Sequence, residues 1–486
     1  MSIQIRRREL QFLPDASRVL LRPFIQSNPE RVTHIIERAL SLDDDEIEHE
    51  LAVVLRDFGT RHLDLEPALL RHFAKVQKLV PTGRPLSKSL RLLIGALFTG
   101  EYSLESAALF NPSIVPHPYQ GDMPDGSLRF ILSLRAVGEG HVSSIEFRTG
   151  VIDMQGGIKL DVVSRHVVAP DIVPNPTYNK AAFTFKLNEM GFQNASAETI
   201  MSPLKDNFTL ADLDKSISVF TNSAEPQTRE GTRTLECVRW LAESNYDLSF
   251  SPALAVSERI IFPVSPNESN GIEDARFVRF TETDGTVTYY ATYTAYNGRV
   301  ILPQLIETHD FLNFHVRTLN GSAVQNKGMA LFPRRINGRY AMISRQDDEN
   351  LFIMFSDNPH FWNDPATLLT PAHPWELVKI GNCGSPIETE AGWLVLTHGV
   401  GPMRRYCIGA ILLDLNDPSR VIGRLDEPLI RPEESERDGY VPNVVYTCGA
   451  LLHGRELILP YALSDKASVI ASVSIDELLE QLHKKC

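Results

Sequence analysis

The sequence predicts a mainly β protein: a five-bladed β-propeller with an N-terminal helical domain and a partly helical insertion in the first repeat. One observation is a strand-like segment, apolar through its middle and polar at its end, that occurs five times, at residues 128–137, 287–296, 339–347, 392–401 and 456–465. A second is that the last four copies recur roughly every 50–60 residues, a period typical of propeller blades. The third is the longer first gap, which indicates an insertion in that repeat.

The first hundred residues have the periodicity of helices. Apolar residues recur three and four positions apart over 32–40, 47–55 and 69–76, and the acidic run at 43–45 suits a helix N-terminus. Prolines at 81 and 85 interrupt this pattern before a last apolar helix. We expect residues 1–104 to form a helical N-terminal domain packed on the rest of the chain.

Strand patterns begin near residue 105, and we expect the propeller to span residues 105–475. In the four later repeats a second apolar strand follows the first, at 300–307, 351–356, 406–415 and 467–475. The insertion runs from about 165 to 240 and contains several prolines and a helix capped by Thr209. Residues 476–486 are predicted to be a C-terminal helix and tail.

The composition limits the classes of partner. The formal net charge of −13 argues against nucleic acid or an anionic membrane as the main partner, because both need a basic face. The chain starts without an apolar signal segment and has no apolar run of about 18 residues. Five scattered cysteines without C-x-x-C spacing indicate reduced thiols, no metal site and a cytoplasmic location. The N-terminal helices could mediate a homo-oligomer or could cap the propeller.

Reactive polar residues stand at the ends of the repeated strands. They are Arg135, Tyr296, Arg345, His398 and Asp465. Because matching strand ends of propeller blades converge on the axis, we expect these side chains to form one site. Such a site indicates an enzyme that acts on a small polar substrate.

The most distinctive short motif is residues 271–277, which contain adjacent carboxylates, Glu273 and Asp274. Since side chains alternate along a strand, we expect one to face the axis and the other to face outward or to pair with Arg276. A partly desolvated carboxyl group in a central cavity could keep its proton and act as a general acid. The alternative is a surface cluster of weak ion pairs.

Basic residues also lie at repeat ends or in the loops that follow them. They are Arg135, Arg299, Lys327, Arg345, His398, Arg404 and Arg405. Together they would bind an oxyanion such as phosphate, although any single arginine could be an ordinary surface charge. Glu307 and Glu349 could supply the base that activates water in inverting glycoside hydrolysis, or could be rim residues.

Several blocks of the sequence resemble one family of carbohydrate-active enzymes. They include GIEDARF at 271–277, TYTAYNG, Asn326-Lys327, RINGRY, KIGNCGSPIETEAGWLVLTHGV, IGAILLDLNDPSRVIGR, PNVVY and PYALSD. Their order and spacing, over about 105–150 and 245–475, resemble glycoside hydrolase family 130, which contains β-mannoside phosphorylases and some β-mannosidases. Members of this family are five-bladed β-propellers.

The resemblance implies roles for individual residues. Asp274 would be the general acid, acting through the mannose 3-hydroxyl, although Ala275 replaces the proline usual in this motif. The phosphate-binding residues implied are Arg135, Arg299, Lys327 and His398. The residues implied or expected to contact the sugar are Asn111, Glu273, Arg276, Tyr296, Arg345 and Asp465.

Three hypotheses follow for the function. The first is an inverting phosphorylase that converts a β-mannoside and phosphate to α-mannose 1-phosphate and a shortened acceptor, with no cofactor beyond the co-substrate phosphate. The second is an inverting β-mannosidase with Glu307 or Glu349 as base, since Arg299-Val300 stands where many phosphorylases have Arg-Asn. The third is a non-catalytic glycan-binding propeller.

Overall fold

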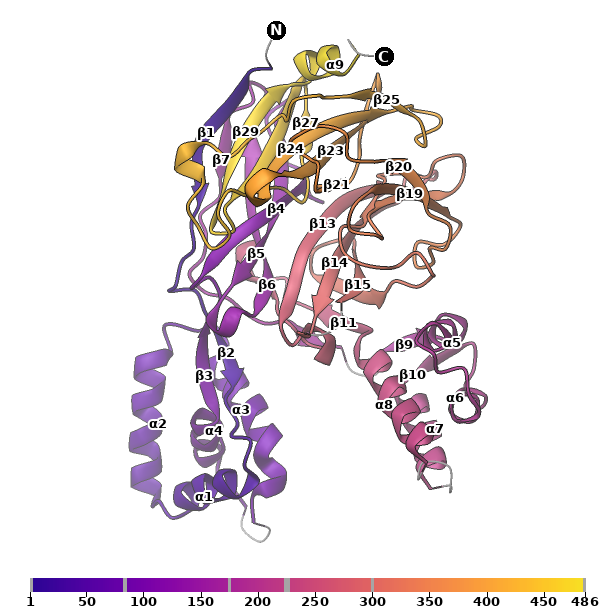
Figure 1. The fold of residues 1–486 in the computed structure, drawn as a ribbon. Coiled ribbons are helices and arrows are strands. Elements are labelled where there is room, and N and C mark those ends of the chain that lie inside the picture. Colours follow the sequence, from indigo (N-terminus) through magenta and orange to yellow (C-terminus); the bar gives the residue numbers. More distant parts are fainter. Residues whose placement is uncertain (1–2, 82–84, 174–175, 223–227, 299–300, 484–486) are drawn as a thin grey trace.

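The computed structural model describes residues 3–81, 85–173, 176–222, 228–298 and 301–483. A body of β-strands carries two helical parts that project from the same end of it, the first built from α1–α4 and the second from α5–α8 (Figure 1). The prediction of a mainly β protein with added helices is confirmed. The closure of the strands into a propeller stays a prediction.

Apart from the two-stranded sheets β2–β3 and β9–β10, the described strands fall into five groups. The first holds β4 (Ala108–Pro116), β5 (Leu128–Val137), β6 (Ser143–Ile152), β7 (Ile158–Leu160) and β12 (Ile260–Ile261). The second holds β13 (Gly271–Thr281), β14 (Val287–Tyr296), β15 (Ile301–Thr308), β16 (Asn313–Thr318), β11 (Tyr246–Ser249) and β8 (Asp171–Ile172). A single parallel pair, Gly271 with Ser143, joins these two groups.

The third group holds β17 (Ala330–Leu331), β18 (Tyr340–Ser344), β19 (Leu351–Ser356) and β20 (Ala366–Leu369). The fourth holds β21 (Lys379–Asn382), β22 (Ile387–Thr389), β23 (Gly392–Gly401), β24 (Arg405–Leu413) and β25 (Val421–Arg424). The fifth holds β26 (Val445–Tyr446), β27 (Leu451–His453), β28 (Glu456–Leu463), β29 (Ala467–Ser474) and β1 (Ile5–Phe12).

The five repeated segments of the sequence all form strands. They correspond to β5, β14, β18, β23 and β28, and β18 and β28 end a few residues earlier than predicted. The end of β28 is set by Ser464 and Asp465, whose left-handed φ angles of 46° and 53° turn the chain out of the sheet. The second apolar strands of the later repeats are β15, β19, β24 and β29, as predicted.

Hydrophobic clusters lie between successive groups, because each sheet is buried on both faces. The cluster between the first and second groups contains Phe147 and Phe277, and the next contains Phe280 and Met342. Later clusters contain Ile353 with Trp393, Leu396 with Leu459 and, between the fifth and first groups, Leu132 with Ile458. Packing on both faces explains why the strands are apolar throughout and do not alternate.

The N-terminal segment is less helical than predicted. Its helices are α1 (Pro29–Leu40), α2 (Asp44–Phe58), α3 (Leu65–Val76) and α4 (Lys88–Leu97). Before them β1 pairs with β29, and β2 (Val19–Pro23) pairs with β3 (Thr99–Ser103). The helices expected within 1–104 are present, and the segment also contains short strands at both ends that the helical periodicity did not predict, because distant partners supply their hydrogen bonds.

The insertion contains β9 (Thr177–Asn179), α5 (Lys180–Glu189), α6 (Ala195–Met201), β10 (Asn207–Thr209), α7 (Leu210–Thr221) and α8 (Arg229–Glu243). Thr209 and Asp212 form the expected capping box of α7. The helices share a core that includes Phe208 and Phe220. The chain ends in α9 (Ile475–His483), close to the helix predicted there.

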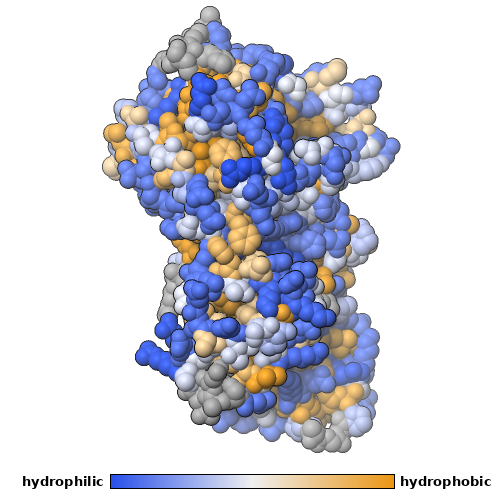
Figure 2. Space-filling view, turned by 90° about the vertical axis from the view of Figure 1, so that its right-hand side faces the viewer, coloured by the Kyte–Doolittle hydropathy of each residue, from blue (hydrophilic) through white to orange (hydrophobic). Residues whose placement is uncertain are grey.

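The surface is mainly hydrophilic on the face drawn in Figure 2, where hydrophobic residues emerge in scattered patches. Within the described residues, no helix combines the length and apolar character required to cross a bilayer. The four cysteines that the structure describes, Cys237, Cys383, Cys407 and Cys448, are buried free thiols.

A buried ionic network joins the N-terminal segment to the first group. Arg18 lies 2.7 Å from Glu105 Oε1 and 2.7 Å from Glu146 Oε2, and Arg148 contacts the same two carboxylates at 2.6 and 3.1 Å. Arg18 also donates to the carbonyl oxygen of Ser257 at 2.8 Å. All four side chains are almost fully buried. Burial and the neighbouring Glu146 raise the pKa of Glu105 to about 8, so at neutral pH Glu105 keeps its proton and Glu146 is the anion that the two arginines share.

Replacing Arg18 by Met should destabilise the protein strongly, because it removes a buried donor from the Glu146 carboxylate, from Glu105 and from the carbonyl oxygen of Ser257. We expect the free energy of unfolding in urea to fall by about 3–5 kcal/mol. Arg56→Met is the control, since its guanidinium is exposed and pairs with exposed Asp57. Equal stability of the two variants would contradict this account of the network.

Candidate active site

A pocket of about 490 Å³ collects polar side chains from all five groups. Its lining residues are Asn111, Arg135, Glu273, Asp274, Ile301, Asn326, Lys327, Arg345, Asp348, Lys379, His398, Arg404, Tyr406, Val441, Val444, Tyr446 and Asp465. Four of the five strand-end residues expected to converge are among them. The fifth, Tyr296, has its ring centre 5.7 Å from Lys327 Nζ at the edge of this pocket.

The adjacent carboxylates of β13 both line the pocket, which corrects the expectation that they would point in opposite directions. The pairing of β13 with β14 shifts register between Glu273 and Arg276, and Asp274 has a left-handed φ of 54°. A bulge adds one residue to a strand and breaks the alternation of its side chains. This local distortion brings Glu273 and Asp274 into the same cavity.

A glycine permits the close approach of strands just before this bulge. Gly271 has φ of 122°, and a Cβ atom there would lie 2.5 Å from the backbone nitrogen of Ser143. A side chain at this position would push β13 away from β6 and would displace the bulge that follows.

Asp274 is surrounded by donors. The amide nitrogen of Asn111 donates to Oδ1 at 2.7 Å, Arg135 Nη1 lies 3.5 Å from the same oxygen, and Arg276 Nη2 lies 3.7 Å from Oδ2. Burial by itself would raise the pKa of Asp274, but Arg135, Arg276, Asn111 and Lys327 outweigh it and lower the pKa below its ordinary value. The expectation that desolvation keeps this carboxyl protonated is therefore wrong when only protein groups surround it.

Glu273 links two cations. Arg135 Nη2 lies 3.0 Å from its Oε1, and Lys327 Nζ lies 2.5 Å from its Oε2. These pairs hold Arg135 and Lys327 on the same side of the pocket. An anion entering the pocket would find both cations already in place.

His398 is neutral, although it was expected to contribute to a cationic cluster. Burial, followed by the charges of Arg345, Arg276 and Lys379, lowers its pKa well below the ordinary value. Its Nδ1 lies 3.2 Å from the carbonyl oxygen of Asn382, and its Nε2 lies 3.3 Å from Arg345 Nη1. Nδ1–H therefore donates to the carbonyl, while Nε2 accepts from Arg345 and orients that guanidinium.

Asp465 differs from Asp274 in its protonation. Burial and the nearby charge of Asp274 raise its pKa to about 6, and Arg135 and Arg404 oppose this rise only in part. The pocket thus holds two carboxyl groups with opposite shifts: the pKa of Asp274 is lowered and that of Asp465 is raised.

The two candidate bases, Glu307 and Glu349, do not line this pocket. Glu307 pairs with His360 at 3.1 Å and lines a different cavity, and Glu349 is an exposed residue of the turn after β18. Glu307 lies six residues along β15 from pocket-lining Ile301, which is about 20 Å at the rise of a strand. Arg299 lies outside the described residues.

Arg276, predicted from the sequence to pair with an adjacent carboxylate, is buried beside the pocket and does not line it. It donates to Tyr446 Oη at 2.7 Å and to the backbone oxygens of Asp274 and Cys383, both at 2.8 Å. The lining residues Tyr446 and Lys379 were not singled out from the sequence, although both lie in blocks that carry the family resemblance, PNVVY and KIGNCGSPIETEAGWLVLTHGV. Among the described residues, no cluster of three or more His, Cys, Asp and Glu side chains could hold a metal ion.

Comparison with known proteins matches the chain to characterised enzymes. A family model described as beta-1,4-mannooligosaccharide phosphorylase matches residues 252–484. The chain is 34% identical over 228 residues to a 1,2-beta-oligomannan phosphorylase of Thermoanaerobacter sp. (strain X514), covering 45% of this chain and 75% of that protein. It is 33% identical over 230 residues to a beta-1,2-mannobiose phosphorylase of Listeria innocua, covering 46% of this chain and 63% of that protein.

A solved structure of beta-1,2-mannobiose phosphorylase from Listeria innocua, in complex with beta-1,2-mannobiose, aligns with 79% of this chain and 94% of its own, at 26% identity and a TM-score of 0.48. The sequence matches agree with the resemblance found in the motifs. The chain belongs to glycoside hydrolase family 130, and it is an enzyme of that family.

Proposed function

We propose that this enzyme catalyses the inverting phosphorolysis of a β-mannoside, yielding α-mannose 1-phosphate and a shortened acceptor. The observation that carries the proposal is one pocket in which the Asp274 carboxylate stands beside Arg135, with Lys327 and Arg345 in the same lining. Phosphorolysis needs an acid for the leaving oxygen and cations for a phosphate nucleophile. The relatives, all named as phosphorylases of mannosides, support the same reaction class.

We further propose that the five groups of strands are the blades of a propeller spanning 105–475. Hydrophobic clusters between each successive pair of groups, and between the fifth and the first, support this arrangement. Residues 1–104 and 476–486 would be the N-terminal domain and the C-terminal helix and tail. A cytoplasmic location would suit the reaction, because the sugar phosphate is retained there. Size-exclusion chromatography would test for assembly into a homo-oligomer.

In the proposed mechanism phosphate occupies the cationic side of the pocket. Arg135 and Lys327 are prepositioned by Glu273, and Arg345 by His398. A phosphate oxygen attacks the anomeric carbon on the face opposite the leaving oxygen, and the configuration inverts. The glycosidic bond breaks as the leaving oxygen receives a proton from Asp274, through the mannose 3-hydroxyl if the family resemblance extends to this step.

The low pKa of Asp274 links proton donation to phosphate binding. Arg135 and Lys327 are among the groups that hold this pKa down. Negative charge on a bound phosphate would offset these cations and raise the pKa of Asp274. The acid would then become protonated when the nucleophile is present, which would disfavour cleavage without phosphate.

Asp274→Asn should reduce kcat for a β-mannoside roughly 10²–10⁴-fold, because the amide cannot supply the proton. Initial rates with β-1,2- and β-1,4-linked mannobiose would measure this loss, and the melting temperature would check the fold. Asp357→Asn is the matched control, since that carboxylate is exposed. Undiminished activity of Asp274→Asn would remove Asp274 from the mechanism.

Mannose 1-phosphate should form only when inorganic phosphate is added. Lys327→Met should raise the KM for phosphate about tenfold or more, because a charge-assisted contact of about 1.5–3 kcal/mol is lost. Lys466→Met, on an exposed residue, serves as control. Free mannose released equally without phosphate would identify a hydrolase instead, and binding of mannosides without turnover would identify a glycan-binding protein.

Asp465→Asn should stabilise the protein at neutral pH while lowering activity. The pKa of Asp465 is raised from 3.8 to about 6, so the folded chain keeps a proton that the unfolded chain releases between these pH values. Its ionisation therefore lowers stability as pH rises through this window, and asparagine avoids that cost. The melting temperature of Asp465→Asn should exceed that of the parent chain at pH 7.5, and the gap should shrink towards pH 4. A pH-independent gap would contradict the assignment; Asp364→Asn, on an exposed residue, is the control.

A further inference from the structure

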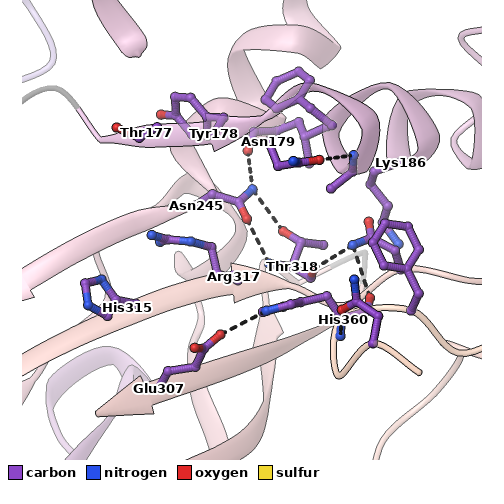
Figure 3. A pocket seen from close by; sticks show the side chains of 16 residues that line it. Thr177, Tyr178, Asn179, Lys186, Asn245, Glu307, His315, Arg317, Thr318 and His360 are labelled. Atoms are coloured by element: carbon purple, nitrogen blue, oxygen red, sulfur yellow. Dashed lines mark hydrogen bonds and ion pairs between the residues drawn. The ribbon is translucent and has the colours of Figure 1, made fainter. Parts of the chain in front are cut away.

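We propose that a second pocket, between the helical insertion and the second group of strands, binds a neutral oligosaccharide without cleaving it. The cavity holds about 540 Å³. Its walls come from β9, α5 and α8 of the insertion, from β15 and β16, and from residues 358–361 (Figure 3). None of its lining residues also lines the pocket of Asp274.

The floor of this pocket is made of paired charges. Glu307 accepts from His360 at 3.1 Å (Figure 3). Arg317 and His315, which also line the pocket, both pair with Asp247 just outside the lining, at 2.8 and 2.9 Å. These side chains are only partly covered, so their polar atoms face the cavity as well as each other.

The wall from α5 adds one more paired cation. Lys186 Nζ lies 3.2 Å from Glu189 Oε2 and donates to the carbonyl oxygen of Leu319 at 3.0 Å. The cations that line the pocket are therefore already paired with carboxylates, and the Glu307 carboxylate would repel an anionic ligand. Arg317 would in the same way repel a cationic ligand. This balance favours a ligand that is polar and uncharged.

The remaining polar groups suit hydroxyls, which both donate and accept. The amide oxygens of Asn179 and Asn358 accept backbone N–H groups at the rim, at 3.0 and 2.9 Å. In the described part of the chain no partner is present for their amide nitrogens, and only one carboxylate oxygen of Glu307 is used by His360. A mixture of planar donors and acceptors on one concave surface matches a polyhydroxylated chain.

Aromatic rings supply the apolar part of the surface. Phe361, half-buried in the loop after β19, lines the cavity, and Phe183 of α5 lies behind it in the core of the insertion with 5% of its surface exposed. The ring faces of sugars carry C–H groups that pack on aromatic side chains, while their hydroxyls point to the polar rim. The combination of rings and uncharged hydrogen-bonding groups indicates an oligosaccharide and not a small polar ion.

The position of the pocket separates it from catalysis. Glu307 lies about 20 Å along β15 from the residue that lines the pocket of Asp274. The insertion walls, from 177 to 245, also lie outside the region matched by the family model. Sugar bound here would not reach Asp274, so the site would hold a long substrate or product near the enzyme.

Binding can be measured independently of turnover. Isothermal titration calorimetry of the Asp274→Asn chain with β-1,2-mannotetraose, chosen from the proposed function, should give two sites. His360→Ala or Asn358→Ala in this background should weaken one site at least about tenfold, and Asn111→Ala, in the pocket of residue 274, should weaken only the other. His34→Ala, on an exposed residue of α1, is the control.

In the otherwise unaltered enzyme, His360→Ala should leave the kcat for mannobiose unchanged while raising the KM for longer chains. A single site, or two sites that ignore both His360→Ala and Asn358→Ala, would overturn the inference. Binding of mannose 1-phosphate at the His360-sensitive site in place of the tetraose would also overturn it, because the ligand would be an anion. If the proposed catalysis fails but the His360-sensitive site persists, only the proposed function is refuted.

Discussion

The bulge at Asp274 is the local constraint on which the candidate active site depends. A regular strand would direct Glu273 and Asp274 to opposite faces, and the left-handed residue places both carboxylates in one cavity. Such a conformation is unfavourable for a non-glycine residue and persists because its surroundings hold it. Arg276 helps to hold this conformation, since its guanidinium donates to the backbone oxygens of Asp274 and Cys383 and to the hydroxyl of Tyr446.

Charge balance around the bulge explains the chemistry proposed for the pocket. Each carboxylate is matched by cations from other groups, so the pocket carries many charges at fixed positions with little freedom to rearrange. Cations lower the pKa of Asp274, while burial and that same carboxylate raise the pKa of Asp465. A bound phosphate would change this balance more than a neutral sugar would, which makes phosphate occupancy the natural control of the acid.

The helical parts extend the enzyme beyond the strands shared with its family. The N-terminal strand β1 pairs with the last long strand of the chain, and the buried network around Arg18 anchors the following segment to the first group. The insertion rests against β15 and β16 and forms a polar cavity with them. The N-terminal segment and the insertion both lie outside the region matched by the family model. These contacts fix the position of each on the β body.

Periodicity and motif content were enough to predict the repeated strands, the capped helix at Thr209 and the family. Five segments read as one repeated strand form β5, β14, β18, β23 and β28, because a strand buried on both faces needs an apolar run that is visible in the sequence. Arg135, Arg345, His398 and Asp465 were also found in this way, since equivalent strand ends meet in space.

Tertiary structure alone decided the features that depend on distant partners. The register shift at Asp274 arises from pairing with β14, and the neutral state of His398 arises from burial beside Arg345. Glu307, a candidate base by sequence, lies at the far end of β15 beside His360. Local patterns determine which residues form a strand, but bulges, protonation states and distances along a sheet are set by side chains that the sequence places tens or hundreds of residues away.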